Sequence, residues 1–335
     1  MDVALALVGF LAGVALIVWG AETFAEHLGS ASVRLGVSTF ALALLLAGAE
    51  PEELATTVTA SVRGAPAIAL GDVIGANVTV CLVALGVGAL VAPLPFGGQV
   101  RRYALLGIPL AIAMVLVAWD GQVGRLEGAL LVGMYAVYVT VIWVKERRPP
   151  ALGETGEIEV AAARQSRTPG TAGEGTAGEG TAGEGTAGAG RDVAWTVVGV
   201  AAMVVGAMLL VESVRSLTDV EETQTTLALT IVGFATGFEL VALAWAAARR
   251  GISEAVVAAV VGSFAYNATM SLGVAALARP LRLGDTTVLH LPLALMLGAF
   301  VLVLVLALPS GRLDRRRGLL LLACYPLFVA VVALR

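Results

Sequence analysis

Long apolar runs, each broken by only a few polar residues, follow one another along the whole chain. Several exceed the roughly 20 residues that a helix needs to cross the hydrocarbon core of a bilayer. The pattern predicts ten spanning helices, with approximate bounds 3–21, 37–62, 67–94, 103–119, 126–144, 193–214, 226–248, 252–278, 287–308 and 319–334. Composition agrees, because 58% of the 335 residues are hydrophobic, 14% are charged and the mean hydropathy is +0.91. A soluble domain carries about 25% charged residues, so we predict an all-α integral membrane protein.

Two stretches of the chain, each covering parts of two neighbouring runs, read as copies of one unit. The first begins at Gly48 and extends to about Leu90, and the second begins at Phe234 and extends to about Leu277. Each contains an acid, then an Arg-Gly pair, then glycines at matching intervals. With five helices in each half, the two copies lie in opposite orientations. Such inverted repeats place a transporter's binding site near the bilayer midplane, between the halves.

A run of Gly, Thr, Ala and Glu separates the halves and cannot bury a core. It predicts a flexible acidic linker at 146–191. The first half is then 1–145, with its repeat at about 37–94. The second half is 192–335, with its repeat at about 226–278. Most of the 21 basic residues fall in alternate loops, which places both termini outside the cell and the central loop in the cytoplasm. The chain is therefore expected to be a multi-pass protein of the cell membrane.

Carboxylates inside the apolar runs are the candidate chemistry. An ionised acid within a bilayer is costly unless a cation, a proton or water compensates it, so such acids are functional candidates. Glu53 and Glu239 are the principal pair, and the apolar runs around them hold no basic partner. A purely structural pairing with a buried arginine is the less favoured reading. An intramembrane hydrolase is also disfavoured, because a phosphate site needs positive charge; no enzyme activity, catalytic residue, cofactor or nucleic-acid partner is predicted.

The paired units resemble the alpha repeats of the cation/calcium antiporter superfamily, which includes the sodium/calcium exchangers. The family reads Gly-Thr-Ser-Leu-Pro-Glu, then a short apolar helix, then Gly-Ser-Asn-Ile-Phe-Asn or Asp. The first copy here has Gly-Ala-Glu-Pro-Glu-Glu at 48–53 and Gly-Ala-Asn-Val-Thr-Val at 75–80. The second has Phe-Ala-Thr-Gly-Phe-Glu at 234–239 and Gly-Ser-Phe-Ala-Tyr-Asn at 262–267. The resemblance spans nearly the whole chain.

The resemblance implies a secondary antiporter whose ion-coordinating glutamates are Glu53 and Glu239. It also implies that Thr236, Ser263 and Asn267 supply neutral oxygens in the second repeat. Calcium takes about six to eight oxygen ligands from carboxylates, amides and backbone groups. The expected cargo is therefore Ca²⁺ and Na⁺, or H⁺, and the expected partners are inorganic cations and the lipid bilayer, with the oligomeric state left open.

Departures from the family pattern weaken the case for calcium. The family's Ser falls on Ala76 and its amide ligand on Val80, and the position that is often Asp is Asn267. Fewer oxygens and charges suit a monovalent ion better than a divalent one. A proton-coupled antiporter for sodium or another cation that does not move calcium is therefore the main alternative. A non-transporting membrane scaffold that has lost its ligands is a lower one.

Further polar residues could offset the missing ligands. Glu50, Glu52 and Asp72 have no acidic counterparts in the second repeat, and Asn77 and Thr79 lie near them. Glu50 and Glu53 share a helix face, whereas Glu52 points about 100° away from Glu53. Pro51 disturbs the local register, so Glu52 is an alternative to Glu53 as the first-repeat ligand. Asp72 is too far along a helix from Val80 to replace it and is expected to line the ion path or to be a hydrogen-bonded structural acid.

Overall fold

The structure is a computed structural model that describes residues 3–34, 50–146, 185–251 and 253–334. Within these ranges nine helical spans are long and apolar enough to cross a membrane. The second predicted span, 37–62, falls partly outside the described residues, and its described part is a single helix from Pro51 to Val62. The prediction of an all-helical membrane fold is confirmed.

The first half contains the helices α1 (Val3–Arg34), α3 (Pro51–Val62), α4 (Pro66–Thr79), the π-helical segment η1 (Val80–Ala84), α5 (Leu85–Val91), α6 (Gly98–Ala118) and α7 (Arg125–Glu146). The second half contains α9 (Gly185–Leu217), α10 (Glu221–Leu227), the π-helical segment η2 (Ala228–Val232), α11 (Gly233–Thr236), α12 (Phe238–Arg249), α13 (Ser253–Tyr266), the π-helical segment η3 (Asn267–Ser271), α14 (Leu272–Ala278), α15 (Thr287–Ala307) and α16 (Arg315–Ala333). Helix α9 begins inside the predicted linker, so residues 185–191 extend a spanning helix instead of belonging to the linker. The Gly, Thr and Ala residues that suggested a linker are compatible with a helix once the apolar run that follows has formed.

Two short antiparallel ladders join the halves at opposite ends of the bundle. Strand β1 (Leu94–Pro95) pairs with β4 (Arg312–Leu313), and β2 (Gln122–Val123) pairs with β3 (Leu281–Arg282). Each ladder takes one strand from each half. The two ladders are therefore equivalent under the inverted repeat that the sequence predicts.

Glycine contacts between helices repeat the same symmetry. Gly86 in α5 lies against α16, where an added Cβ would be 3.1 Å from the carbonyl oxygen of Gly318. Gly273 in α14 lies against α7, where an added Cβ would be 2.7 Å from the carbonyl oxygen of Gly128. The last helix of each half therefore packs on the repeat of the other half, and the halves interlock.

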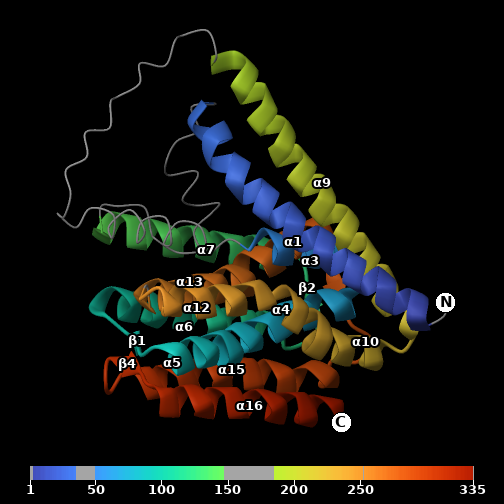
Figure 1. Cartoon of the computed structure of the whole chain (residues 1–335). Helices are drawn as coiled ribbons and strands as arrows, with labels where there is room; N and C mark the ends of the chain where they lie inside the picture. Colours follow the sequence, from blue (N-terminus) through green and yellow to red (C-terminus); the bar gives the residue numbers. More distant parts are fainter. Residues whose placement is uncertain (1–2, 35–49, 147–184, 252, 335) are drawn as a thin grey trace.

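Helices α1 and α9 form a separate antiparallel pair that slants across the other helices (Figure 1). An added Cβ at Gly13 would lie 2.7 Å from the carbonyl oxygen of Gly206, and one at Gly20 would lie 2.7 Å from that of Gly199. Only 22% of the α1 span and 28% of the α9 span are buried, against 89% for Pro66–Val91 and 94% for Val256–Ala278. The spans Pro66–Val91 and Val256–Ala278 are therefore the interior of the bundle, and α1 and α9 lie on its outside, as does α16, whose span is also 22% buried.

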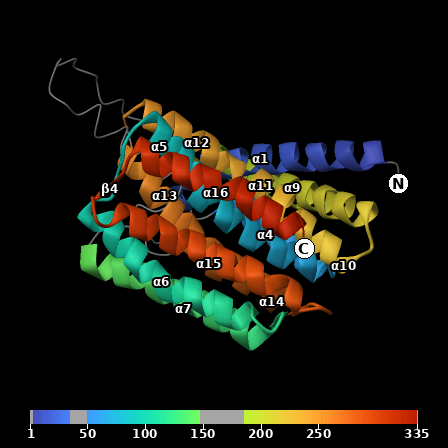
Figure 2. The same cartoon turned by 90° about the horizontal axis from the view of Figure 1, so that it is seen from below.

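The start of α1 and the end of α16 lie at the same end of the bundle (Figures 1 and 2). An even number of crossings has this consequence. The arrangement therefore agrees with ten spans, of which the described residues supply nine.

Candidate functional site

Helix α3 begins with three buried acids. Glu50 is its N-cap residue, Pro51 occupies the first turn, and Glu52 and Glu53 follow. Proline suits a helix start because its missing N–H has no partner there in any case. The exposed fractions of Glu50, Glu52 and Glu53 are 2%, 2% and 0%. The local sequence therefore starts a helix inside the bundle and turns its acidic first turn away from lipid.

Glu50 is joined to the second repeat by a hydrogen bond from Asn267. The Asn267 amide donates from Nδ2 to Oε2 of Glu50 at 3.2 Å and to the Ser263 hydroxyl at 3.4 Å. Ser271, one turn after Asn267, donates to Oδ1 of that amide at 3.2 Å. Asn267 is the first residue of η3, and Ser263, Asn267 and Ser271 are all buried. Three candidate ligands from opposite halves therefore meet in one cluster.

Asp72 lies between the halves in a different cluster. Thr57 of α3 donates to its Oδ2 at 3.2 Å, and Thr236 of α11 donates to its Oδ1 at 3.0 Å. Asp72 is fully buried, and no basic side chain of the described residues forms an ion pair with it. Both of its oxygens are engaged by hydroxyl groups, as a hydrogen-bonded structural acid requires.

Other buried oxygens have no hydrogen-bond partner among the described residues: both carboxylate oxygens of Glu53, Oε1 of Glu50 and Oδ1 of Asn77. The Asn77 amide nitrogen contacts the Met296 sulfur at 3.7 Å. Buried polar atoms are nearly always paired in native proteins, so each exception points to a missing water, ion or ligand. Thr79 differs, because its hydroxyl donates to the Gly75 carbonyl at 2.9 Å.

Glu239 lies at the corresponding helix start in the second half. It is in the first turn of α12, just after Gly237, and its side chain is half-buried. Gly64 and Gly251 have φ values of 72° and 77° and turn the chain after α3 and α12, two helices of 12 residues each. Glu52 is the second residue of α3 and Glu239 is the second residue of α12, so the two acids occupy equivalent positions before these glycines. The structural register therefore favours the alternative pairing, whereas Glu53 is the acid whose oxygens are left open.

Two positions in the first repeat supply no side-chain oxygen. Ala76 and Val80 are fully buried, and they correspond to Ser263 and Asn267 in the second repeat. Val80 begins η1 just as Asn267 begins η3, so the backbone is equivalent at both places. The departures seen in the sequence are therefore real differences between two equivalent positions.

The sequence did not single out two contacts, those of Ser271 with Asn267 and of Met296 with Asn77. A signal existed for Ser271, because it is four residues after Asn267 and therefore on the same helix face. Met296 comes from α15, which is distant in sequence. Nothing in its local pattern could indicate the contact.

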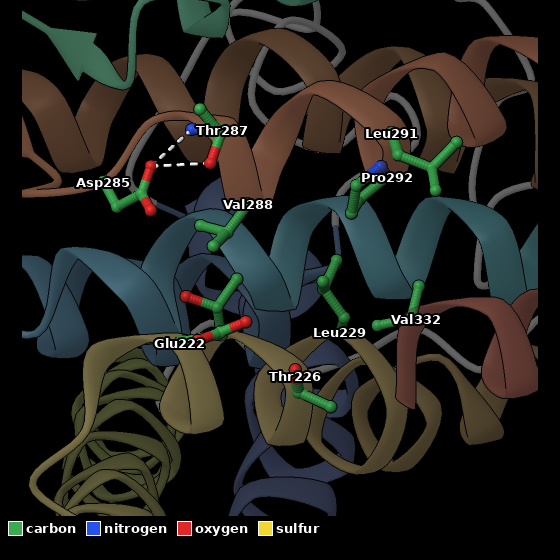
Figure 3. A pocket seen from close by; sticks show the side chains of 10 residues that line it. Glu222, Thr226, Leu229, Asp285, Thr287, Val288, Leu291, Pro292 and Val332 are labelled. Carbon is green, nitrogen blue, oxygen red and sulfur yellow. Dashed lines mark hydrogen bonds between the residues drawn. The ribbon is translucent and has the colours of Figure 1, made fainter. Parts of the chain in front are cut away.

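A cavity of about 240 Å³ opens at one end of α10, α15 and α16 (Figure 3). Its polar residues include Glu222, Thr226 and Asp285, and Leu229 contributes to its apolar wall. The Asp285 carboxylate accepts from the backbone N–H and the hydroxyl of Thr287 at 2.9 and 2.7 Å. This cavity is separate from the buried acids, whereas a much smaller one has Glu52 and Thr236 in its wall, next to α1 and α9.

The buried acids that the structure describes around Glu50 and Glu53 do not form an all-carboxylate metal site, so a cation held there would also need neutral oxygen ligands. Among the described residues, no three His, Cys, Asp or Glu side chains converge as a metal-binding group. Glu50, Asp72 and Glu52 nevertheless act electrostatically on Glu53. Carboxylate, hydroxyl and amide oxygens suit hard cations such as Ca²⁺ and Na⁺.

Comparison with known proteins gives a consistent picture. A family model described as "Sodium/calcium exchanger protein" matches residues 5–144 and 192–334. The putative antiporter CaxA of Alkalimonas amylolytica is 24% identical over 327 residues, with 94% of each chain covered. The sodium/calcium exchanger MaX1 of Methanosarcina acetivorans is 34% identical over 86 residues, which is 25% of each chain. A solved structure of the sodium-calcium exchanger NCX_Mj, soaked with sodium and strontium, covers 99% of both chains with a TM-score of 0.59 and 21% identity. The chain belongs to the sodium/calcium exchanger protein family.

Proposed function

We propose that the protein is a secondary active cation antiporter that exchanges Na⁺ and Ca²⁺ at one site between its halves. The observation that carries this proposal is the set of buried oxygens of Glu50, Glu53 and Asn77 without hydrogen-bond partners among the described residues. A buried carboxylate is costly unless a cation or proton compensates it. A bound cation would satisfy the oxygens of Glu50 and Glu53, whose carboxyls lie close enough to interact, and Asn77 offers a neutral oxygen.

The proposed ligands divide into three groups. Glu53, Glu50 and Asn77 present open oxygens, and Glu239 and Glu52 are the register-matched acids of the two repeats. Engaged hydroxyl groups surround them and could turn an oxygen toward an ion. These are Thr236, Ser263 and Thr79, with Asp72 held by threonines and Asn267 bonded to Glu50.

Alternating access would move the pair α1 and α9 against the remaining helices. This proposal is supported by the position of the pair on the outside of the bundle and by its internal glycine contacts. The two β ladders tie the remaining helices together at both ends. The small cavity beside Glu52 and Thr236 lies at the boundary between the two bodies.

The proposed orientation puts both termini outside and the central loop in the cytoplasm. The inner face then holds Arg101 and Arg102 at the start of α6 and four arginines between Arg312 and Arg317. An excess of arginine on the cytoplasmic side is the usual arrangement in membrane proteins. The cavity near Glu222 and Asp285 would then face the outside.

A proton-coupled antiporter that does not carry calcium is the second candidate. It is favoured by Ala76 and Val80, which leave the first repeat with fewer oxygens than the second. A proton needs only one carboxylate, and sodium needs less compensating charge than calcium. The two candidates use the same site but differ in the ions that they move.

Ion flux in proteoliposomes tests both candidates. Radioactive calcium uptake would be driven by an outward sodium gradient, with a pH-sensitive dye in the same vesicles. Sodium-driven uptake that is abolished in Glu53→Gln supports sodium/calcium exchange. Proton flux that depends on Glu53, without calcium movement, supports the second candidate, and silence in both assays contradicts antiport.

A further inference from the structure

Glu50 and Asn267 come from opposite repeats, and their contact has a defined direction. The Asn267 amide turns its nitrogen toward Oε2 of Glu50 and its oxygen toward the Ser271 hydroxyl. The donor end of the amide therefore faces the acid, and the acceptor end is already engaged. In this arrangement Asn267 holds a negative group and does not offer its oxygen beside Glu50.

The other oxygen of Glu50 has a different environment. Oε1 is buried and has no hydrogen-bond partner among the described residues. Asp72 provides a comparison within the same molecule, because Thr57 and Thr236 engage both of its oxygens. A carboxylate that only joined the two halves would be expected to be satisfied in the same way. Asn267 holds one oxygen of Glu50, whereas Oε1 receives no donor from the described residues although the Glu53 carboxyl and the Ser263 hydroxyl lie close to the same side chain.

We propose that Glu50 supplies the negative charge of the second-repeat ligand position and that Asn267 is the positioning residue that holds it there. The inference rests on the proposed function and makes it more specific. The ligand position that is often Asp in the family is occupied here by Asn267. The inference assigns the negatively charged ligand beside that position to Oε1 of Glu50, which comes from the first repeat. The ligand class is a hard cation, because the group offered is a carboxylate oxygen.

Electrostatics explains why the pair contains one acid and one amide. Two carboxylates at the 3.2 Å separation of this contact would repel each other in a poorly screened interior. An amide donor instead stabilises the Glu50 carboxylate through a charge-assisted hydrogen bond. The negative charge can therefore be at position 50 or at position 267, but placing it at both is unfavourable unless a cation or a shared proton lies between them.

This exchange of charge gives a direct test on the purified full-length protein. The variants are Glu50→Gln, Asn267→Asp and the double variant, with Glu22→Gln on the exposed face of α1 as the control. The melting temperature is measured without added cation and then across calcium and sodium titrations. A ligand that binds only the folded state raises the melting temperature by an amount that grows with the logarithm of its concentration relative to its dissociation constant.

Glu50→Gln is expected to weaken cation binding by at least about tenfold, because ligand charge count sets affinity in such sites. Asn267→Asp is expected to lower the melting temperature of the cation-free protein through repulsion. The double variant is expected to recover that temperature and to bind cations within about threefold of the wild type. A residue that only supports packing would not produce this recovery.

The inference is overturned if the double variant binds no better than Glu50→Gln, or if Asn267→Asp melts at the wild-type temperature without cations. These results differ from a failure of the proposed function. A wild-type protein that binds cations and shows the recovery but carries no flux contradicts antiport alone. A wild-type protein with no cation-dependent shift contradicts both.

Discussion

The segments α4–η1 and α13–η3 share a backbone but differ in chemistry. Each follows a left-handed glycine, and each changes from α to π geometry at the equivalent residue, Val80 or Asn267. The first segment carries Asp72, and the equivalent residue of the second segment is a buried alanine, Ala259. Conversely, the second segment has side-chain oxygens at Ser263 and Asn267, and the equivalent residues of the first segment, Ala76 and Val80, have none. The two repeats therefore share their backbone geometry but not their side chains: the first carries the acids Glu50, Glu52, Glu53 and Asp72, whereas the second carries Glu239 with the neutral side chains of Thr236, Ser263 and Asn267.

The largest expected effect tests the acidic half. Glu53→Gln removes the charge whose two oxygens are unpartnered within the described structure. We expect cation affinity to fall by roughly two orders of magnitude, because charge count dominates affinity for hard cations. Cation titration of the purified protein measures it, and Glu22→Gln is the control. An unchanged affinity would show that the acidic half does not bind the ion.

The next effect concerns the contact that sets α4 against the second half. Gly75 lies so close to Leu229 of η2 that an added Cβ would collide with the Leu229 backbone. Gly75→Ala is therefore expected to destabilise the protein by about 1–3 kcal/mol through overpacking. Gly133→Ala is the matched control, since an added Cβ there meets nothing within 4 Å. Melting in detergent measures both variants, and equal melting temperatures would contradict the described packing.

A smaller effect is expected at Asp72. Both of its oxygens already accept from threonine hydroxyls, so an asparagine can keep one acceptor and offer a donor to the other hydroxyl. Asp72→Asn should therefore lower flux by only about threefold, within the range of a supporting hydrogen bond. Flux that falls as far as in Glu53→Gln would instead identify Asp72 as a cation ligand.

A further change would make the two repeats more alike. Ala76→Ser restores a hydroxyl at the position where the second repeat has Ser263. The extra oxygen should raise the preference for calcium over sodium by roughly twofold, because calcium takes more ligands. Competition between the two ions measures the preference. A shift toward sodium would contradict the assignment of this position to the site.

The smallest effect lies outside both repeats. Asp314 caps α16 by accepting from the Arg317 backbone N–H at 3.1 Å, and this hydrogen bond lowers the pKa of Asp314 below its ordinary value of 3.8. Asp314→Ala should lower the melting temperature slightly, and Asp314→Asn less, because asparagine also caps helices. Because the pKa of Asp314 is lower in the folded protein, the Asp314 carboxylate stabilises the fold at pH values above its ordinary pKa, and this stabilisation is lost as the pH falls through the lowered pKa. The difference in melting temperature between the wild type and Asp314→Ala should therefore be constant between about pH 5 and 8 and shrink in stronger acid. A change in this difference near neutral pH would contradict the capping role of Asp314.

The sequence predicted the features that depend on local pattern. Apolar runs identified the spans, glycine intervals identified the repeats, and the acids in those runs identified Glu53 and Glu50 as candidates. Contacts across the halves, such as Asn267 with Glu50 or Thr236 with Asp72, depend on tertiary packing and carry no local signal. The Glu52 and Glu53 alternatives differ by one residue next to Pro51, and the equal lengths of α3 and α12 before the turn glycines Gly64 and Gly251 favour Glu52 as the counterpart of Glu239. The π segments were not predicted, because no local residue pattern distinguishes a π turn from an α turn in an apolar helix.

The central claim is that cations cross only in exchange for other cations. Proteoliposomes would be loaded with radioactive calcium and diluted into media with sodium, with unlabelled calcium, or with a bulky organic cation alone. The account predicts rapid calcium efflux into the first two media, almost none into the third, and none in vesicles with Glu53→Gln. Equally fast efflux into all three media would mean that calcium passes without exchange, and it would contradict the antiporter account.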